Sequence, residues 1–269
     1  MRDIAELVGM DPGLTSRIIV LANSAVFRGR NIQSLESALN RIGMAELRRF
    51  CLNRTMIKTM EKIRKSKPGL EELDFKDFWF RFILSARINE RMLLQIAEPT
   101  GWEYLIGLLH EIGSIFLNIY YPEWYHDVYL ELVKDPYCSY IAEKDVFGFT
   151  HEDVIGALAP KWRLPDTLSM AMSYHHHPLG VALETLPDSR RMALSLWITD
   201  KIIANQHLCM PGEYEAEIEH DSLPFPGDEV METPEWKALM RDCRGMDIYV
   251  ALRAEQNVTR GLVGEIQEE

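Results

Sequence analysis

Cysteine is scarce in this 269-residue chain, which has four cysteines and no CxxC pair. The pattern therefore indicates reduced thiols and argues against a disulfide framework or a zinc knuckle. Long apolar runs are also missing. No uncharged apolar run reaches about 18 residues, and the charged N-terminus lacks the apolar core of a signal peptide. These absences predict a cytoplasmic protein that does not enter the membrane.

Basic residues are outnumbered by acidic residues, 29 against 41, which gives a formal net charge of −12. This excess disfavours nonspecific nucleic-acid binding, so nucleic acid is not an expected partner. Residues 41–67 are the exception, with nine basic and two acidic residues. The simpler interpretation is a solvated helix face. The alternative is a docking patch for an acidic partner, formed by Arg48, Arg49, Arg54, Lys58 and Lys62.

Strand patterns are absent as well, because no stretch alternates apolar and polar residues between hairpin signals. Apolar residues recur at helical spacing instead, which predicts an all-α fold. Asp11, Ser34 and the Thr150–Asp153 pair are expected to cap helix starts, and Gly43 to end a helix. The predicted helices cover about residues 12–22, 35–42, 44–64, 75–97, 102–121, 122–134, 139–147, 151–158, 165–177 and 189–207, with a loop at 211–234 and weaker helix at 235–269.

Residues 102–121 are the most apolar part of the chain, and their apolar side chains cover nearly every face of a helix. One long buried helix is therefore predicted. His110, Ser114 and Asn118 recur at every fourth position, with Glu111 beside them, and form a polar stripe. Buried polar groups cost free energy unless they are paired, so this stripe must meet water, a ligand or polar groups on neighbouring helices.

Histidines and carboxylates isolated in apolar helices are candidate ligands for a divalent metal. Each has a simpler explanation, such as a hydrogen-bonded core histidine or a cation at a helix C-terminus. Their combination over four predicted helices favours a site in the core of a bundle, where a metal could generate hydroxide. The candidates are His110, Glu111, His151, His175, His176 and Asp200.

Several motifs follow one another in a fixed order over about three quarters of the chain. They are DPGLT at 11–15, LANSA at 21–25, GLLHEIG at 107–113, WRLP at 162–165 and the histidine pair at 175–176. In this order and spacing they resemble the HDOD domain, a divergent branch of the HD superfamily of metal-dependent phosphohydrolases.

The resemblance implies an HDOD domain over 1–207, with a small N-terminal helical bundle at 1–65 and an HD-like core at 70–207. Residues 208–269 would form an acidic extension. The extension is most simply solubilising, and alternatively screens the basic segment of the same molecule. Family members usually carry another helix ahead of the position that is Met1 here, so the natural chain is expected to begin earlier.

HD enzymes that this core resembles bind metal through an early histidine, a His-Asp doublet and a late aspartate. The doublet falls on His110 and Glu111, the aspartate on Asp200, and the early histidine near Arg81. Arginine is always protonated and has no lone pair for a metal, and glutamate is one methylene longer than aspartate. We hypothesise that Arg81 replaces the cation and pairs with Glu111 or Asp200. The alternative is a surface arginine and an alignment shifted by one residue.

HDOD domains resemble output or adaptor modules of bacterial signalling. The resemblance and the altered motif together imply a signalling protein that binds a protein partner or small regulator, with a pocket near His110, no cofactor and no hydrolase activity. The alternative is a metal-dependent phosphohydrolase with a changed ligand set that holds Mn, Fe, Mg or Zn. Oligomeric state is left open by the sequence.

Overall fold

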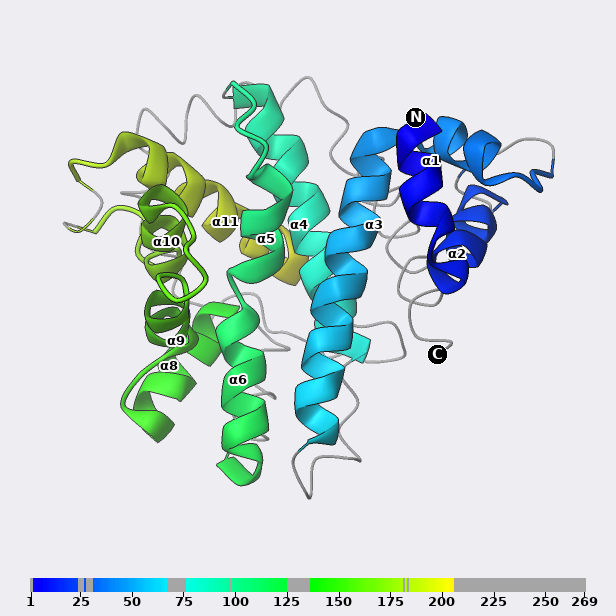
Figure 1. Ribbon diagram of the computed structural model, residues 1–269. Coiled ribbons are helices and arrows are strands. Elements are labelled where there is room, and N and C mark those ends of the chain that lie inside the picture. The colour runs from blue at the N-terminus through cyan, green and yellow to red at the C-terminus, as the bar shows by residue number, and fades with distance from the viewer. Residues whose placement is uncertain are drawn as a thin grey trace. The chain divides into compact units, whose positions relative to one another are not determined.

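The structure, a computed structural model, describes residues 2–23, 27, 31–66, 76–96, 98–124, 136–180, 182 and 184–205. Every regular element in these ranges is a helix, which confirms the predicted all-α class (Figure 1). None of the described helices is both long and apolar enough to span a membrane. The predicted loop at 211–234 and helix at 235–269 lie outside the described residues, as does most of the helix predicted at 122–134.

The described residues fall into two compact units, the first within Met1–Lys67 and the second within Pro68–Leu252. The first unit contains α1 (Arg2–Gly9), α2 (Pro12–Asn23) and α3 (Leu35–Lys65). The second contains α4 (Lys76–Ile96), α5 (Glu103–Leu109), α6 (Ile112–Tyr120), α8 (Pro136–Phe147), α9 (His151–Leu158), α10 (Asp166–Ser173) and α11 (Pro187–Asn205). The predicted domain boundaries at 65, 70 and 207 stay predictions.

Two of the predicted helix caps are present in the first unit. Asp11 Oδ1 accepts a hydrogen bond from the backbone N–H of Leu14 at 3.0 Å, and Ser34 Oγ caps α3. Gly43 interrupts α3 with φ 77° and ψ 167°, a backbone conformation that glycine adopts readily. Helix α1 was not predicted, although its apolar residues at positions 4, 7 and 8 have helical spacing.

Two of the five residues of the predicted docking patch on α3 are not exposed. Arg54 is buried, with 7% of its surface exposed, because it lies one turn from the buried Phe50 on the inward face of the helix. Arg49 is half-buried and forms an ion pair with Glu46 at 2.7 Å. Inclusion of Arg54 in a surface patch was therefore wrong. Exposed members of the predicted patch are Arg48, Lys58 and Lys62.

The long helix predicted at 102–121 is two helices, α5 and α6 (Figure 1). The chain leaves helical geometry at Glu111, where φ is −93° and ψ is 2°. The buried side chains of His110 and Glu111 contact groups on other helices, and we infer that these contacts outweigh the hydrogen bonds of an uninterrupted helix. Helix α10 is also shorter than predicted, since it ends at Ser173 and leaves the histidine pair in the following turn.

Helix α4 is the centre of the second unit and packs against both α5 and α11. Buried aromatic side chains, among them Trp79 and Trp197, fill the core of this unit. Asn89 of α4 bridges the two neighbours, because its Nδ2 donates to the Glu103 carbonyl at 2.8 Å and its Oδ1 accepts from Ser195 Oγ at 2.7 Å. These bonds satisfy a buried amide and fix α5 and α11 relative to α4.

We expect Gly107→Ala to lower the free energy of unfolding by roughly 1–3 kcal/mol, as overpacking does in a tight core. An added Cβ would lie 2.7 Å from the Ala86 Cα, where α5 approaches α4. Gly9→Ala is the matched control, because its Cβ would meet only Leu35 Cδ2 at 3.8 Å. Urea unfolding of both variants checks this expectation. Equal stabilities would show that α5 and α4 are not closely packed.

Candidate functional site

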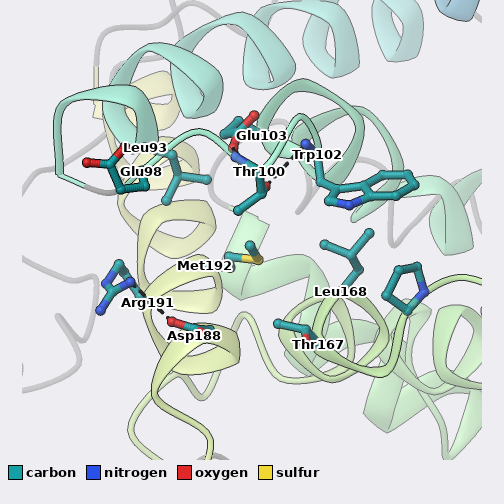
Figure 2. Close-up of a pocket in the computed structure, with 11 residues that line it drawn as sticks. Leu93, Glu98, Thr100, Trp102, Glu103, Thr167, Leu168, Asp188, Arg191 and Met192 are labelled. Carbon is teal, nitrogen blue, oxygen red and sulfur yellow. Dashed lines mark hydrogen bonds and ion pairs between the residues drawn. The ribbon is translucent and has the colours of Figure 1, made fainter.

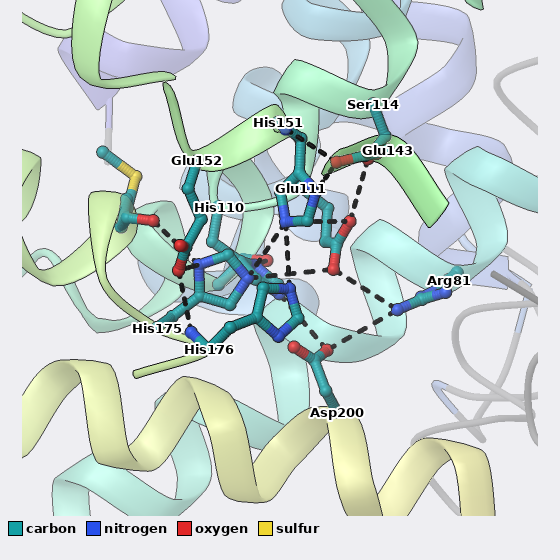
Figure 3. A network of polar contacts seen from close by, with 12 residues as sticks. Arg81, His110, Glu111, Ser114, Glu143, His151, Glu152, His175, His176 and Asp200 are labelled. Atoms are coloured by element: carbon teal, nitrogen blue, oxygen red, sulfur yellow. Dashed lines mark hydrogen bonds and ion pairs between the residues drawn. The ribbon is translucent and has the colours of Figure 1, made fainter. Parts of the chain in front are cut away.

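The structure brings together all the metal-ligand candidates of the sequence, in one cluster of the second unit (Figure 3). They come from the break between α5 and α6, the first turn of α9, the turn after α10, and α11. Each side chain is buried, with at most 3% of its surface exposed. The polar cluster comprises His110, Glu111, His151, His175, His176 and Asp200.

Three of the imidazoles are oriented through their Nδ1 atoms. His110 and His175 each place Nδ1 at 2.8 Å from the backbone carbonyl three residues earlier, and His151 places Nδ1 at 2.6 Å from Glu143 Oε2. Since these acceptors require an N–H, Nδ1 carries a proton in each ring. The Nε2 atoms therefore face the centre of the cluster, which is the arrangement of histidines that bind a metal.

The Nε2 atoms of the cluster come unusually close together. His151 Nε2 lies 3.1 Å from His176 Nε2 and 3.4 Å from His175 Nε2. Two lone pairs repel at such a distance, so a proton or a metal ion must lie between them. Burial lowers the pKa of His151, but the carboxylates of Glu143 and Glu111 outweigh burial and raise this pKa to about 10. Burial and the neighbouring histidines lower the pKa of His176 well below its usual value. The shared proton therefore belongs to His151.

Arg81 of α4 reaches the same cluster from the other side (Figure 3). Its Nη2 lies 3.4 Å from Glu111 Oε1 and 3.9 Å from Asp200 Oδ1, and only 3% of the residue is exposed. Burial raises the pKa of Glu111, but the charges of His151 and Arg81 overcome burial and hold it well below its usual value. The guanidinium thus stands beside the two carboxylates that the sequence assigned to it. Its role as a cation substitute stays a prediction.

Two overlapping groups in the cluster could hold a metal ion. In each group the ligand atoms lie within 4.8 Å of one another. An ion about 2.0–2.2 Å from every ligand needs them within about 4.4 Å, so a small contraction suffices. The groups are Glu111 with His151, His175 and His176, and Glu111 with His110, His175 and Asp200.

The two groups differ in how well they suit a cation. The group of three histidines and Glu111 has the nitrogen and oxygen ligands that zinc, iron and manganese accept, and it fits a metal. The group with Asp200 contains both carboxylate oxygens that face the Arg81 guanidinium. A metal there would lie beside a fixed positive charge, so this second group fits a metal only if Arg81 moves. Asp200 Oδ2 is buried and accepts no hydrogen bond from the described residues.

Three further residues support the cluster, and of these only Ser114 was named from the sequence, as a member of the polar stripe. Glu143 of α8 accepts hydrogen bonds from both the backbone N–H and Nδ1 of His151. Glu152 Oε1 accepts from the backbone N–H of His176 at 2.8 Å, and burial raises the pKa of this carboxyl group. Ser114 Oγ donates to Glu111 Oε2 at 3.1 Å. The position of Ser114 in the polar stripe indicated a polar contact. Glu143 gave no such indication, because it lies in a helix whose composition is that of a surface helix.

In protein stripped of metal, the pKa of His151 makes stability depend on pH. Below pH 6.5 the folded and the unfolded chain both protonate this imidazole, and its contribution is fully present. Between pH 6.5 and about 10 only the folded chain does, so the free energy of unfolding falls as pH rises. The raised pKa of His175 acts in the same direction.

We expect Glu143→Gln to reduce this decline, because the substitution removes the nearest charge that raises the pKa of His151. Urea unfolding over the same pH range, with chelator present, is the measurement. Glu123→Gln is the control, since Glu123 is exposed. An identical decline in wild type and in both variants would refute the assignment of the proton to His151.

The comparisons with known proteins agree with this architecture. The HDOD domain matches residues 1–178. An "Uncharacterized protein" of Treponema pallidum (strain Nichols) is 24% identical over 179 residues, which make up 66% of this chain and 34% of that protein. The chain therefore spans about a third of the length of this relative.

Crystal structures of similar fold cover nearly all of the chain. An "HDOD domain protein with unknown function" from Geobacter sulfurreducens superposes with a TM-score of 0.67, at 23% identity, over 100% of this chain and 87% of that one. A "Putative signal transduction protein" from Marinobacter aquaeolei VT8 gives a TM-score of 0.61, at 20% identity, over 100% and 55%. A "Putative phosphohydrolase" from Shewanella amazonensis SB2B gives 0.59, at 18% identity, over 99% and 87%. With a helical fold and a domain match over most of its described length, the chain belongs to the HDOD domain family.

Proposed function

We propose that this protein is a non-catalytic signalling module of the HDOD type, which acts by binding a protein partner or a small regulator. The observation that carries the proposal is the buried guanidinium of Arg81 beside Glu111 and Asp200. A guanidinium supplies positive charge but offers no coordination position for water or a phosphoryl oxygen. In this proposal the chain itself supplies the positive charge that a metal would supply beside these two carboxylates in an HD enzyme.

Burial of the polar cluster supports a role without turnover. The six residues of the cluster and Arg81 are each at most 3% exposed. A phosphoester would need a rearrangement of the surrounding helices before it reached these groups. The name of the Marinobacter protein, a signal transduction protein of the same fold, is consistent with a signalling role.

A metal-dependent phosphohydrolase is the second candidate, and the orientation of the histidines favours it. Glu111, His151, His175 and His176 would hold the ion, and Glu143 would keep His151 in the tautomer that offers Nε2. A bound divalent metal supplies a hydroxide at neutral pH and a Lewis acid for a phosphoryl oxygen. Such an enzyme would lack the early histidine ligand of the HD pattern, whose position falls near Arg81.

Phosphoester turnover separates the two candidates. Protein purified without chelator is expected to hydrolyse neither p-nitrophenyl phosphate nor bis(p-nitrophenyl) phosphate above the rate of buffer with added Mn²⁺, Mg²⁺ or Fe²⁺. The physical reason is that Arg81 places a positive charge beside Glu111 and Asp200 but cannot activate water. Turnover that is lost in both His110→Ala and Asp200→Ala would contradict the proposal and establish the hydrolase.

Replacement of Arg81 by histidine tests whether the arginine stands in for a cation. We expect Arg81→His to bind about one more equivalent of Mn²⁺ or Fe²⁺ than wild type, because an imidazole adds a neutral ligand beside Glu111 and Asp200. Elemental analysis after desalting measures the difference.

Arg81→Met is the matched control, because it removes the charge without adding a ligand. It is expected to lose stability, since removing one partner of a buried pair costs roughly 3–5 kcal/mol. Circular dichroism shows whether each variant is folded. Equal metal content in a folded histidine variant and in wild type would show that the cation position does not exist.

A further inference from the structure

A cavity of about 490 Å³ lies in the second unit, and none of its lining residues belongs to the polar cluster (Figure 2). The cavity is formed where the chain leaves α4 and where α5, α10 and α11 begin. Its volume is typical of sites that hold one small organic molecule. Its lining residues are Leu93, Glu98, Thr100, Trp102, Glu103, Pro165, Thr167, Leu168, Asp188, Arg191 and Met192.

The buried part of the lining is mostly apolar. Leu93, Leu168 and Met192 are themselves buried and present their side chains to it. Trp102 stands at one side of the opening and keeps 39% of its surface exposed (Figure 2). A partly exposed indole beside an apolar cavity offers a large flat surface on which an aromatic or aliphatic body can pack.

The charges of the lining favour a cation over an anion. Glu103 is buried, and its carboxylate accepts hydrogen bonds from Thr100 and Gly101, so it is not available to a ligand. Asp188 and Arg191 neutralise one another in an exposed ion pair at 3.2 Å. The remaining charge of the lining is the exposed carboxylate of Glu98.

Glu98 stands in a negative environment. It follows α4, which ends at Ile96, and the carbonyl end of a helix carries a partial negative charge. The helices that begin at the cavity carry partial positive charge there, and each has an acidic residue in its first turn to offset it, namely Glu103 in α5, Asp166 in α10 and Asp188 in α11. Within the part of the chain that the structure describes, the Glu98 side chain forms neither an ion pair nor a hydrogen bond. A positively charged group is therefore the complementary partner for this side of the opening.

We propose that this cavity binds a small organic ammonium compound, with its apolar or aromatic body on Trp102, Leu168 and Met192 and its cationic head at Glu98. This compound would be the small regulator of the proposed signalling function, and its biological role rests on that function. The cavity and the polar cluster share three helices, since α5, α10 and α11 each begin at the cavity and lead toward a residue of the cluster. The occupant would thus contact the helices that position His110 and Asp200.

A charge series on one aromatic body tests the proposal. Tryptamine, tryptophol and indole-3-acetate share the indole and differ in the charge of the side chain. Isothermal titration calorimetry of the full chain is expected to show saturable binding of tryptamine, roughly two- to fivefold tighter than tryptophol, as one partly exposed ion pair contributes. Indole-3-acetate is expected to bind more weakly than both.

Two variants and a control locate the binding. Glu98→Gln should abolish the preference for tryptamine over tryptophol, and Trp102→Ala should weaken both compounds. Glu123→Gln, a change of another exposed acid in the same unit, should alter neither. Circular dichroism verifies the fold of each variant.

Absence of saturable tryptamine binding, or a preference for tryptamine that survives Glu98→Gln, would overturn the proposal. These results are independent of the metal content of the Arg81 variants. Failure of the cavity proposal and failure of the proposed signalling function can therefore be told apart.

Discussion

The fold of the second unit depends on a buried balance of charge. Glu111, Glu143, Glu152 and Asp200 place four carboxyl groups in a region with almost no exposed surface. Isolated buried carboxylates are too costly to persist, so positive groups must stand beside them. Arg81 and the protonated His151 supply positive charge in the metal-free chain. The pKa of Glu111 is held well below its usual value and the pKa of His151 is raised, whereas burial raises the pKa of Glu152 and favours its neutral form.

The helices are arranged to keep these groups together. The break between α5 and α6 directs His110 and Glu111 into the cluster instead of along one continuous rod. Gly113 lets α6 approach the start of α9, because a Cβ at this position would collide with the backbone of His151. The capping box of Thr150 and Asp153 then fixes the first turn of α9, from which His151 projects. The glycine and the capping box, both local features of the sequence, thus help to position the residues of the polar cluster.

The helices and their caps were predictable because they depend on neighbours in the sequence. Asp11, Ser34 and Thr150 start helices as their side chains dictate, and Gly43 breaks one. The break at Glu111 was not predictable from periodicity, since the apolar pattern of residues 102–121 continues across it. Burial of Arg54 was missed for a related reason, because a long basic side chain on an inward face looks the same in sequence as one on the surface.

The candidate site was predictable in its histidines and not in its supporting carboxylates. Imidazoles isolated in apolar helices and the resemblance to a known family together identified the six cluster residues and Arg81. Glu143 and Glu152 were missed, because charged residues on short, mixed helices are usually exposed and only the tertiary fold turns these two inward. The cavity at the start of α5, α10 and α11 could not be predicted either, since it is formed by four segments that are distant in the chain.

The central claim is that a guanidinium occupies the cation position between Glu111 and Asp200. Crystals grown without chelator and soaked in Mn²⁺, with anomalous diffraction recorded at the manganese absorption edge, test it most directly. The account predicts the Arg81 guanidinium within hydrogen-bonding distance of Glu111 and no anomalous peak between Glu111 and Asp200, whether or not the three histidines bind an ion. A peak between these two carboxylates, with Arg81 displaced from them, would contradict it.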